Sequence, residues 1–283
     1  MTNHITIEIA GVRIAIESRS GLDDWNVEAS YRPFVCDRPA DIYLRMLPGH
    51  PAIADSPKVF DSSPVWTLHR QGDTIAFKIF DHLNDQKRIL VLDPDIHTVK
   101  LYFPSGHADF VTPFYGPTLE LLLIQYLARE RGLIVHACGI DGDGDGMLFV
   151  GESGAGKSTI ANLWYQNNGV TILSDDRIIL RKKNGVFWMH GTPWHGEARF
   201  VSSRSTQLKH IFFLRHDQSN AVRQLSRADR VVEFLKAAFP PFWDSPGVEF
   251  AMAFLSDLTE NVSCQELSFK PDASVIDFVR NLK

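Results

Sequence analysis

The sequence predicts an α/β fold with a mixed sheet, preceded by a smaller β-rich domain. Three features support this prediction: short alternating apolar segments in the first part of the chain, a proline and glycine cluster at residues 112–117, and alternating strand-like and helix-like segments after it. We therefore expect a β-rich N-terminal domain at residues 1–112 and an α/β domain at residues 113–283. A chain of 283 residues is long enough for each domain to bury its own core.

The β-rich region begins with two segments of strict alternation, residues 5–9 and 12–16, which flank Ala10-Gly11 and predict a hairpin. Further segments of strand length and composition lie at residues 42–46, 65–69, 74–79, 88–92 and 98–103. The region carries no chemical motif. We expect this domain to complete the fold or to present an acceptor.

The α/β region is predicted to begin with a helix at residues 117–131, because Pro117 suits a first turn and apolar residues recur at helical spacing. Two apolar runs, residues 133–140 and 147–150, then flank an acidic glycine tract and predict a hairpin. Five residues here match the spacing of an EF-hand calcium loop: Asp141, Asp143, Asp145, Gly146 and Glu152. An EF-hand needs helices on both sides, whereas these flanks are strand-like, so we reject calcium binding.

The strongest motif follows directly. Residues 151–159 read GESGAGKST and satisfy the phosphate-loop pattern G-x-x-x-x-G-K-[ST] at every required position. An apolar run precedes the loop and helical spacing follows it, so the motif has the strand, loop and helix context that it requires. Backbone N–H groups and the helix N-terminus surround an anion in such a loop. The expected nucleotide-binding residues are Gly151, Glu152, Ser153, Gly154, Ala155, Gly156, Lys157, Ser158 and Thr159.

These residues imply ATP and Mg²⁺ as cofactors. We expect Lys157 to reach the β- and γ-phosphates and the Ser158 hydroxyl to complete the Mg²⁺ shell. Downstream, the apolar segment 170–174 ends on Asp175-Asp176, an arrangement typical of Walker B, in which a carboxylate lies near the metal.

A loop rich in glycine and proline follows at residues 190–197. Its His190, His195 and Glu197 fit no standard zinc spacing, and only Glu197 is kept as a candidate ligand. The remaining predicted elements are a hairpin at 178–180 and 186–189, a strand at 211–214, and helices at 227–238, 248–255 and 272–282.

Composition narrows the classes of partner. A net charge of −5 and a pI near 6.1 argue against a nucleic acid or an anionic membrane. No stretch approaches the roughly 20 apolar residues of a membrane helix, and the start of the chain does not resemble a signal peptide. Cys36, Cys138 and Cys264 are odd in number and widely spaced, which is typical of reduced thiols in a cytoplasm. We expect a cytoplasmic protein, and the sequence leaves open whether it forms a homo-oligomer.

These residues together resemble the HPr serine kinase/phosphorylase catalytic domain and its related kinases, over roughly residues 130–200. In that family a strand histidine precedes a G-[DE]-S-G-x-G-K-S loop by a hairpin's length, and an Asp-Asp pair follows the loop helix. Here His136 stands 21 residues before Lys157, as in the family, and Asp175-Asp176 comes one residue later than in the family. The resemblance implies a P-loop kinase core of the HPr kinase and phosphoenolpyruvate carboxykinase type.

The resemblance also implies roles for individual residues. Asp176 would be the general base, Asp175 would lie near the metal, and His136 would assist at the reacting phosphate. Glu197 would be a second metal carboxylate, by its approximate distance along the chain. The catalytic set is therefore His136, Lys157 and Asp176, and the metal set is Ser158, Asp175 and Glu197.

The expected function is Mg²⁺-dependent transfer of the ATP γ-phosphoryl group to a hydroxyl, on a serine of a protein or peptide or on a small hydroxylated metabolite. No segment that would recognise HPr itself is found, so the acceptor stays open. A phosphoenolpyruvate carboxykinase-like enzyme would need grouped basic and metal-binding residues for its carboxylate substrate, which are not grouped in this sequence. The other alternative is an ATPase module that switches a partner protein; the absence of an Asn-Lys-x-Asp segment argues against a GTPase switch.

Overall fold

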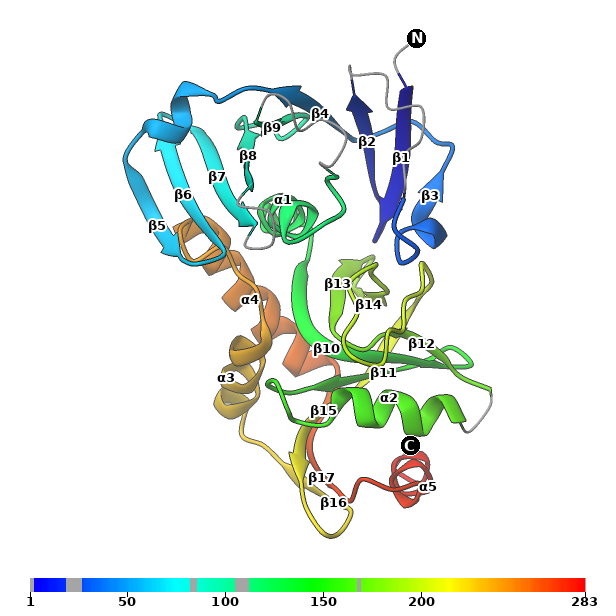
Figure 1. Cartoon of the computed structure of the whole chain (residues 1–283). Helices are drawn as coiled ribbons and strands as arrows, with labels where there is room; N and C mark the ends of the chain where they lie inside the picture. The colour runs from blue at the N-terminus through cyan, green and yellow to red at the C-terminus, as the bar shows by residue number, and fades with distance from the viewer. Residues whose placement is uncertain (1–2, 19–26, 82–85, 105–111, 167–168, 283) are drawn as a thin grey trace. The chain divides into compact units, whose positions relative to one another are not determined.

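The computed structural model describes residues 3–18, 27–81, 86–104, 112–166 and 169–282, which divide into two compact units at residues 126/127 (Figure 1). The sequence-based boundary at 112/113 lies before helix α1 (Thr118–Leu127), whereas the two units divide at the end of this helix. Leu119, Leu122 and Leu123 of α1 are completely buried. The proline and glycine cluster therefore marks the start of a core helix.

The described residues of the first unit form a nine-stranded mixed sheet. Its strands, in spatial order, are β3 (Val35–Cys36), β1 (Asn3–Ile9), β2 (Val12–Ser18), β4 (Ile42–Pro48), β9 (Thr98–Phe103), β8 (Gln86–Leu92), β7 (Thr74–Asp81), β6 (Trp66–Gln71) and β5 (Lys58–Ser62). The β2–β4 and β4–β9 pairs are parallel, and the other neighbours are antiparallel. Short 3₁₀ helices lie at Arg32–Phe34 and Ala52–Asp55.

Every strand predicted for this unit is present. The first hairpin turns at Ala10 and Gly11, which both have positive φ, as a two-residue hairpin turn of type I′ requires. Strands β3 and β5 were not predicted. β3 has only two residues, and β5 lies at the edge of the sheet with most of its side chains exposed, so neither carries a clear apolar alternation.

The described residues of the second unit form an eight-stranded mixed sheet around the long strands β10 (Leu133–Gly142) and β15 (Ser205–His216). The other strands are β11 (Asp145–Val150), β12 (Thr171–Ser174), β13 (Arg177–Lys183), β14 (Val186–His190), β16 (Ala221–Gln224) and β17 (Ser263–Phe269). The helices are α2 (Lys157–Gln166), α3 (Arg227–Ala237), α4 (Ser245–Asn261) and α5 (Ser274–Arg280). This architecture is mixed α/β, as predicted.

Helices cover both faces of this sheet (Figure 1). Along β11, Met147 and Phe149 join a core cluster with residues of α2 and α5, while Leu148 and Val150 join a second cluster with residues of α3 and α4. This alternation follows from the two-residue period of a strand. Strand β11 is therefore buried on both faces, and the loop that follows it is held at the edge of a rigid layer.

Two pairings position the segments that carry the predicted site residues. β12 and β13 both pair antiparallel with β10, with Ser174 opposite Gly139 and Arg177 opposite His136. Asp175 and Asp176 thus interrupt what would otherwise be one strand along β10. On the other side, β11 is parallel to β15, so both strands end at the same edge of the sheet.

The hairpin between β10 and β11 is confirmed, and its turn contains Asp143 and Gly144 at positive φ. Strands therefore flank the acidic tract, as expected when the EF-hand was rejected. Strand β15 is longer than predicted, and β16 and β17 were not predicted. Within β17, Glu266 is buried in an ion pair with Arg215 and Arg223, so a charge interrupts the apolar pattern that would have indicated a strand.

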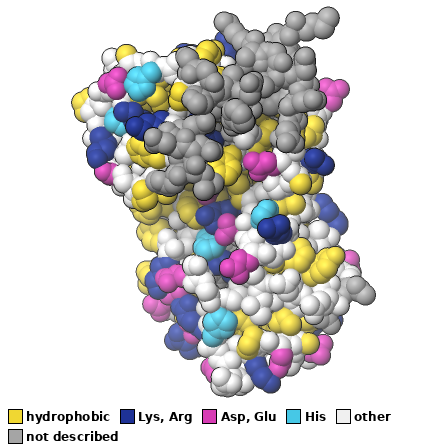
Figure 2. Space-filling model, viewed as in Figure 1, with side chains coloured by type: hydrophobic (Ala, Val, Ile, Leu, Met, Phe, Trp, Pro, Cys, Tyr) yellow, Lys and Arg dark blue, Asp and Glu magenta, His cyan; other side chains and the backbone are white. Residues whose placement is uncertain are grey.

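In the lower half of Figure 2, where the second unit is seen, acidic, basic and histidine side chains are interspersed on the visible face. This face presents no single sign of charge that would attract a polyanion. None of the described helices combines the length and the apolar character required to cross a bilayer.

Candidate functional site

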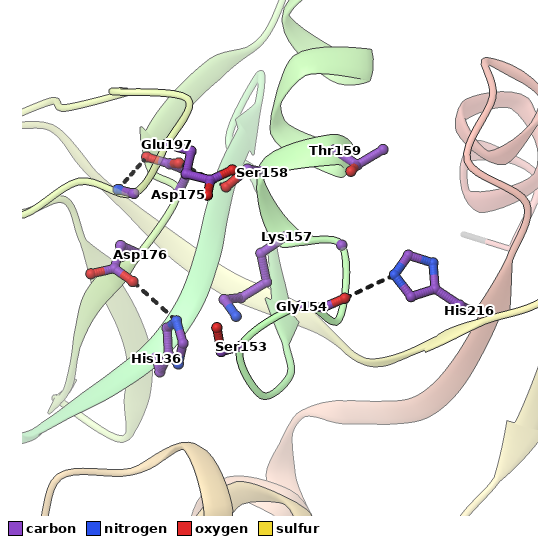
Figure 3. A pocket seen from close by; sticks show the side chains of 12 residues that line it. His136, Ser153, Gly154, Lys157, Ser158, Thr159, Asp175, Asp176, Glu197 and His216 are labelled. Atoms are coloured by element: carbon purple, nitrogen blue, oxygen red, sulfur yellow. Dashed lines mark hydrogen bonds and ion pairs between the residues drawn. The ribbon is translucent and has the colours of Figure 1, made fainter.

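A pocket of about 360 Å³ in the second unit brings the predicted site residues together (Figure 3). Its lining residues come from β10, the glycine-rich loop, α2, the β12–β13 junction, the 196–197 loop and the end of β15: His136, Ser153, Gly154, Gly156, Lys157, Ser158, Thr159, Asp175, Asp176, Gly196, Glu197 and His216. Gly151, Glu152 and Ala155 belong to the same loop without lining the pocket. All three predicted catalytic residues and all three predicted metal ligands lie around it.

The glycine-rich loop connects β11 to α2 and needs its glycines. Gly154 and Gly156 have φ of 82° and 94°, a region that other residues adopt only with strain. A Cβ atom on Gly156 would lie 2.5 Å from Cζ of Phe269, and one on Gly151 would lie 2.6 Å from Cβ of Ala155. The loop is therefore tightly turned and closely packed against the end of β17.

Lys157 begins α2, and only 6% of its surface is exposed. Its Nζ donates hydrogen bonds to the carbonyl oxygens of Gly151 (2.8 Å) and Glu152 (2.9 Å). Burial lowers the pKa of Lys157 below its ordinary value, against the opposing charge of Asp176. The ammonium group thus lies inside the curve of the loop, bonded to neutral acceptors that a stronger anionic acceptor can replace.

Asp175 is only 1% exposed, and its carboxylate accepts four hydrogen bonds. The donors are Ser158 Oγ (3.1 Å) and the backbone N–H groups of Gly196 (3.0 Å), Ala198 (3.0 Å) and Phe200 (3.3 Å). A Cβ atom on Gly196 would lie 2.7 Å from Oδ2 of Asp175, so a glycine is required for this approach. Asp175 therefore ties the first turn of α2 to the loop that carries Glu197.

Asp176 has different partners. Its Oδ1 lies 3.0 Å from Nε2 of His136, and its Oδ2 lies 2.8 Å from Nη1 of Arg177, whose guanidinium packs over the Phe239 ring at 4.4 Å. Burial alone would raise the pKa of Asp176, but the hydrogen bond from His136 and the charges of Arg177, His136 and Lys157 together hold this pKa below its ordinary value. Asp176 is therefore an oriented, ionised carboxylate at neutral pH.

Oxygen ligands for a hard cation are present but sparse. Within the described part of the chain, no group of three or more His, Cys, Asp or Glu side chains is arranged to hold a metal ion. Mg²⁺ typically keeps several waters and takes one or two carboxylates together with substrate phosphates. Ser158, Asp175 and the exposed Glu197 fit that pattern. To contact the ion directly, Asp175 would give up one of its hydrogen bonds; without that change, it would orient the Ser158 hydroxyl that contacts the ion.

His216 lines the pocket although the sequence did not indicate it. Its Nε2 lies 2.9 Å from the carbonyl oxygen of Gly154 in the glycine-rich loop. The polar pattern around residue 216 is typical of an ordinary strand end. His216 reaches the pocket because β15 is parallel to β11, and neighbouring parallel strands bring their carboxyl ends to the same edge of the sheet. This pairing was not predicted from the sequence.

Residues 118–250, slightly less than half of the chain, match the model of a family described as SynChlorMet cassette protein ScmC. No curated protein matches the chain. Among solved structures, the HPr(Ser) kinase/phosphatase from Coxiella burnetii matches with 13% identity and a TM-score of 0.23, over 53% of this chain and 97% of that one.

Proposed function

We propose that this protein is a Mg²⁺-dependent kinase that resembles HPr kinase and transfers the γ-phosphoryl group of ATP to a hydroxyl. One observation carries the proposal. The glycine-rich loop with its Lys157, the Asp175-Asp176 pair and His136 belong to three separate segments of the chain, yet they line one pocket. A loop of amides with a lysine, facing an ionised carboxylate, supplies what phosphoryl transfer requires of a protein: charge neutralisation and alignment of the reacting oxygens.

Residues 151–159 hold the triphosphate in this proposal. The positive φ of Gly154 and Gly156 allows loop N–H groups to turn inward, and the N-terminus of α2 favours an anion. Lys157 exchanges its bonds to the Gly151 and Glu152 carbonyls for bonds to phosphate oxygens, which as charged acceptors bind an ammonium more strongly. Mg²⁺, when bound, would neutralise charge on the β- and γ-phosphates, and Ser158, Asp175 and Glu197 would hold it.

Asp176 acts at the other end of the pocket. Its carboxylate accepts the proton of the acceptor hydroxyl while that oxygen bonds to the γ-phosphorus and the bond to the ADP oxygen breaks. The low pKa of Asp176 makes it a weak base, but phosphoryl transfer has a loose transition state in which orienting the nucleophile counts for much of the effect. His136 and Arg177 provide this orientation, because each bonds a different oxygen of the carboxylate.

The acceptor is found without guessing its identity. Cell extracts are incubated with the protein and ATP labelled in the γ-phosphoryl group, and labelled products are identified by mass spectrometry. The kinase proposal expects a labelled hydroxyl compound with wild-type protein and about 10²-fold less with Lys157→Ala, since losing one electrostatic contact to the transition state costs about 3 kcal/mol. Full transfer by Lys157→Ala would contradict the assignment. ATP turnover that no peptide, serine or sugar accelerates would instead favour an ATPase that switches a partner.

A further inference from the structure

The ring of His216 is held in one orientation. His216 ends β15 and is paired with Phe269 at the end of β17. The two ring centroids lie 5.2 Å apart with planes tilted by 33°, and Phe269 is fully buried. On the loop side, a Cβ atom at Gly156 would lie 3.0 Å from Cε1 of His216. A buried aromatic ring and a glycine turn therefore flank the imidazole, although His216 itself is exposed to solvent.

The tautomer of His216 follows from its partner. A backbone carbonyl can only accept a hydrogen bond, so Nε2 of His216 carries the hydrogen that it donates to Gly154 at 2.9 Å. In the neutral imidazole, Nδ1 is then an acceptor. Among the described residues, Nδ1 has no hydrogen-bond partner. His216, which lines the pocket, thus carries an oriented acceptor that no residue in the described part of the chain uses.

Figure 3 places this acceptor away from the expected reaction centre. His216 and Thr159 lie on one side of Lys157, while His136 and Asp176 lie on the other. If the γ-phosphate is transferred beside Asp176, the rest of the nucleotide extends past the loop toward His216.

We infer that His216 recognises the nucleoside half of ATP: it anchors the glycine-rich loop through Nε2–H and accepts, at Nδ1, a hydrogen bond from an O–H or N–H group of the nucleoside. The donor is a ribose hydroxyl or the adenine amino group, which share this chemistry. The inference rests on the proposed function, because it requires a nucleotide in this pocket. It makes His216 a specificity residue that distinguishes a nucleoside triphosphate from a bare polyphosphate.

The test separates recognition of the nucleoside from support of the loop. The amide nitrogen of Gln can replace Nε2 of histidine, so His216→Gln keeps a donor for Gly154 and removes the acceptor at Nδ1. Calorimetric titrations with Mg²⁺ compare a non-hydrolysable ATP analogue with inorganic tripolyphosphate, for wild type, His216→Gln and His216→Ala. His50→Ala, which alters an exposed histidine of the first unit, is the matched control. Thermal unfolding verifies that each variant is folded.

His216→Gln is expected to weaken binding of the ATP analogue about 3- to 10-fold, as for one lost hydrogen bond, and to leave tripolyphosphate unchanged. His216→Ala should weaken both, because the loop anchor is also lost. Equal weakening of both ligands by His216→Gln, or no effect on either, would overturn the inference while leaving the proposed function intact. If the wild type binds neither ligand, both the inference and the proposed function are wrong.

Two analogues identify the donor. Both are non-hydrolysable triphosphates: one carries 2′,3′-dideoxyadenosine and lacks the ribose hydroxyls, and the other carries purine riboside and lacks the adenine amino group. The analogue that lacks the donor should bind wild type and His216→Gln equally well. If His216→Gln weakens both analogues as much as it weakens the ATP analogue, Nδ1 accepts from neither group and the inference is wrong.

Discussion

Replacing Asp176 by Asn removes one negative charge from the pocket and changes the side-chain volume very little. The carboxylate contacts Nε2 of His136 at 3.0 Å and Nη1 of Arg177 at 2.8 Å, and the three side chains are only 20–25% exposed. In the proposed mechanism Asp176 receives the acceptor proton, and loss of a general base typically slows a reaction about 10²- to 10⁴-fold. We expect kcat for Asp176→Asn to fall within that range, with a smaller effect on KM for ATP.

The structural cost of the same change should be modest. Each ion pair of Asp176 is partly exposed to solvent and is worth up to about 1 kcal/mol, so the loss of both destabilises the protein by about 1–2 kcal/mol. For a protein of this size, that lowers Tm by roughly 2–8 °C. A change this small leaves the protein folded at assay temperature. The loss of kcat therefore reports on chemistry and not on unfolding.

The assay measures initial rates of γ-phosphoryl transfer together with thermal unfolding. Asp257→Asn is a matched control, because Asp257 also forms an ion pair, with Lys182, in the second unit but outside the candidate pocket. This control should lose a little stability and keep its kcat. The reasoning is refuted if Asp176→Asn keeps kcat within about threefold of wild type, or if Asp257→Asn loses as much.

Three further predictions follow from the same geometry. Glu197→Gln should raise the Mg²⁺ concentration for half-maximal activity several-fold and leave Tm unchanged, because in the proposed site this exposed side chain would be a metal ligand and would add little to packing. An unchanged Mg²⁺ requirement would remove Glu197 from the proposed metal site. Gly156→Ala should destabilise the protein by about 2–4 kcal/mol, because the new Cβ would collide with Phe269. Gly185 has open space around it, so Gly185→Ala should cost only about 1–2 kcal/mol, from its positive φ. Equal losses of unfolding free energy for the two variants in denaturant would contradict this packing. Burial lowers the pKa of His190 to about 4, so between about pH 4 and pH 6.5 the unfolded chain carries a proton on His190 that the folded chain lacks. The free energy of unfolding should therefore rise with pH over this range. Urea unfolding of His190→Gln should show a shallower rise, and a slope identical to that of the wild type would contradict this prediction.

The parts of the site that the sequence could predict are contiguous. The phosphate loop is one uninterrupted segment whose residues are spaced by local backbone geometry, so Lys157 and Ser158 could be placed from the pattern alone. The Asp175-Asp176 pair was also identified, but the two residues differ in a way that only the fold defines. Asp175 accepts hydrogen bonds from three backbone N–H groups of a loop more than twenty residues away, whereas Asp176 forms an ion pair with His136 of β10.

The parts that could not be predicted depend on strand order. His216 reaches the glycine-rich loop because β15 runs parallel to β11, and neither the pairing nor its register has a local sequence signal. The nine-stranded order of the first unit is likewise set by contacts between distant segments. Secondary structure was more accessible, since buried strands such as β9 have a two-residue alternation that a short segment already contains.

The measurement that tests the central claim most directly is calorimetric titration of the wild type and of Lys157→Met with a non-hydrolysable ATP analogue in the presence of Mg²⁺. Lys157 is buried against the Gly151 and Glu152 carbonyls, and methionine keeps its unbranched shape, is one atom shorter, and removes the ammonium charge with its donors. The account predicts one site per chain in the wild type and binding about 10²-fold weaker in Lys157→Met, with inorganic tripolyphosphate competing for the wild-type site. Equal affinity of the two proteins would show that the triphosphate does not lie in this loop.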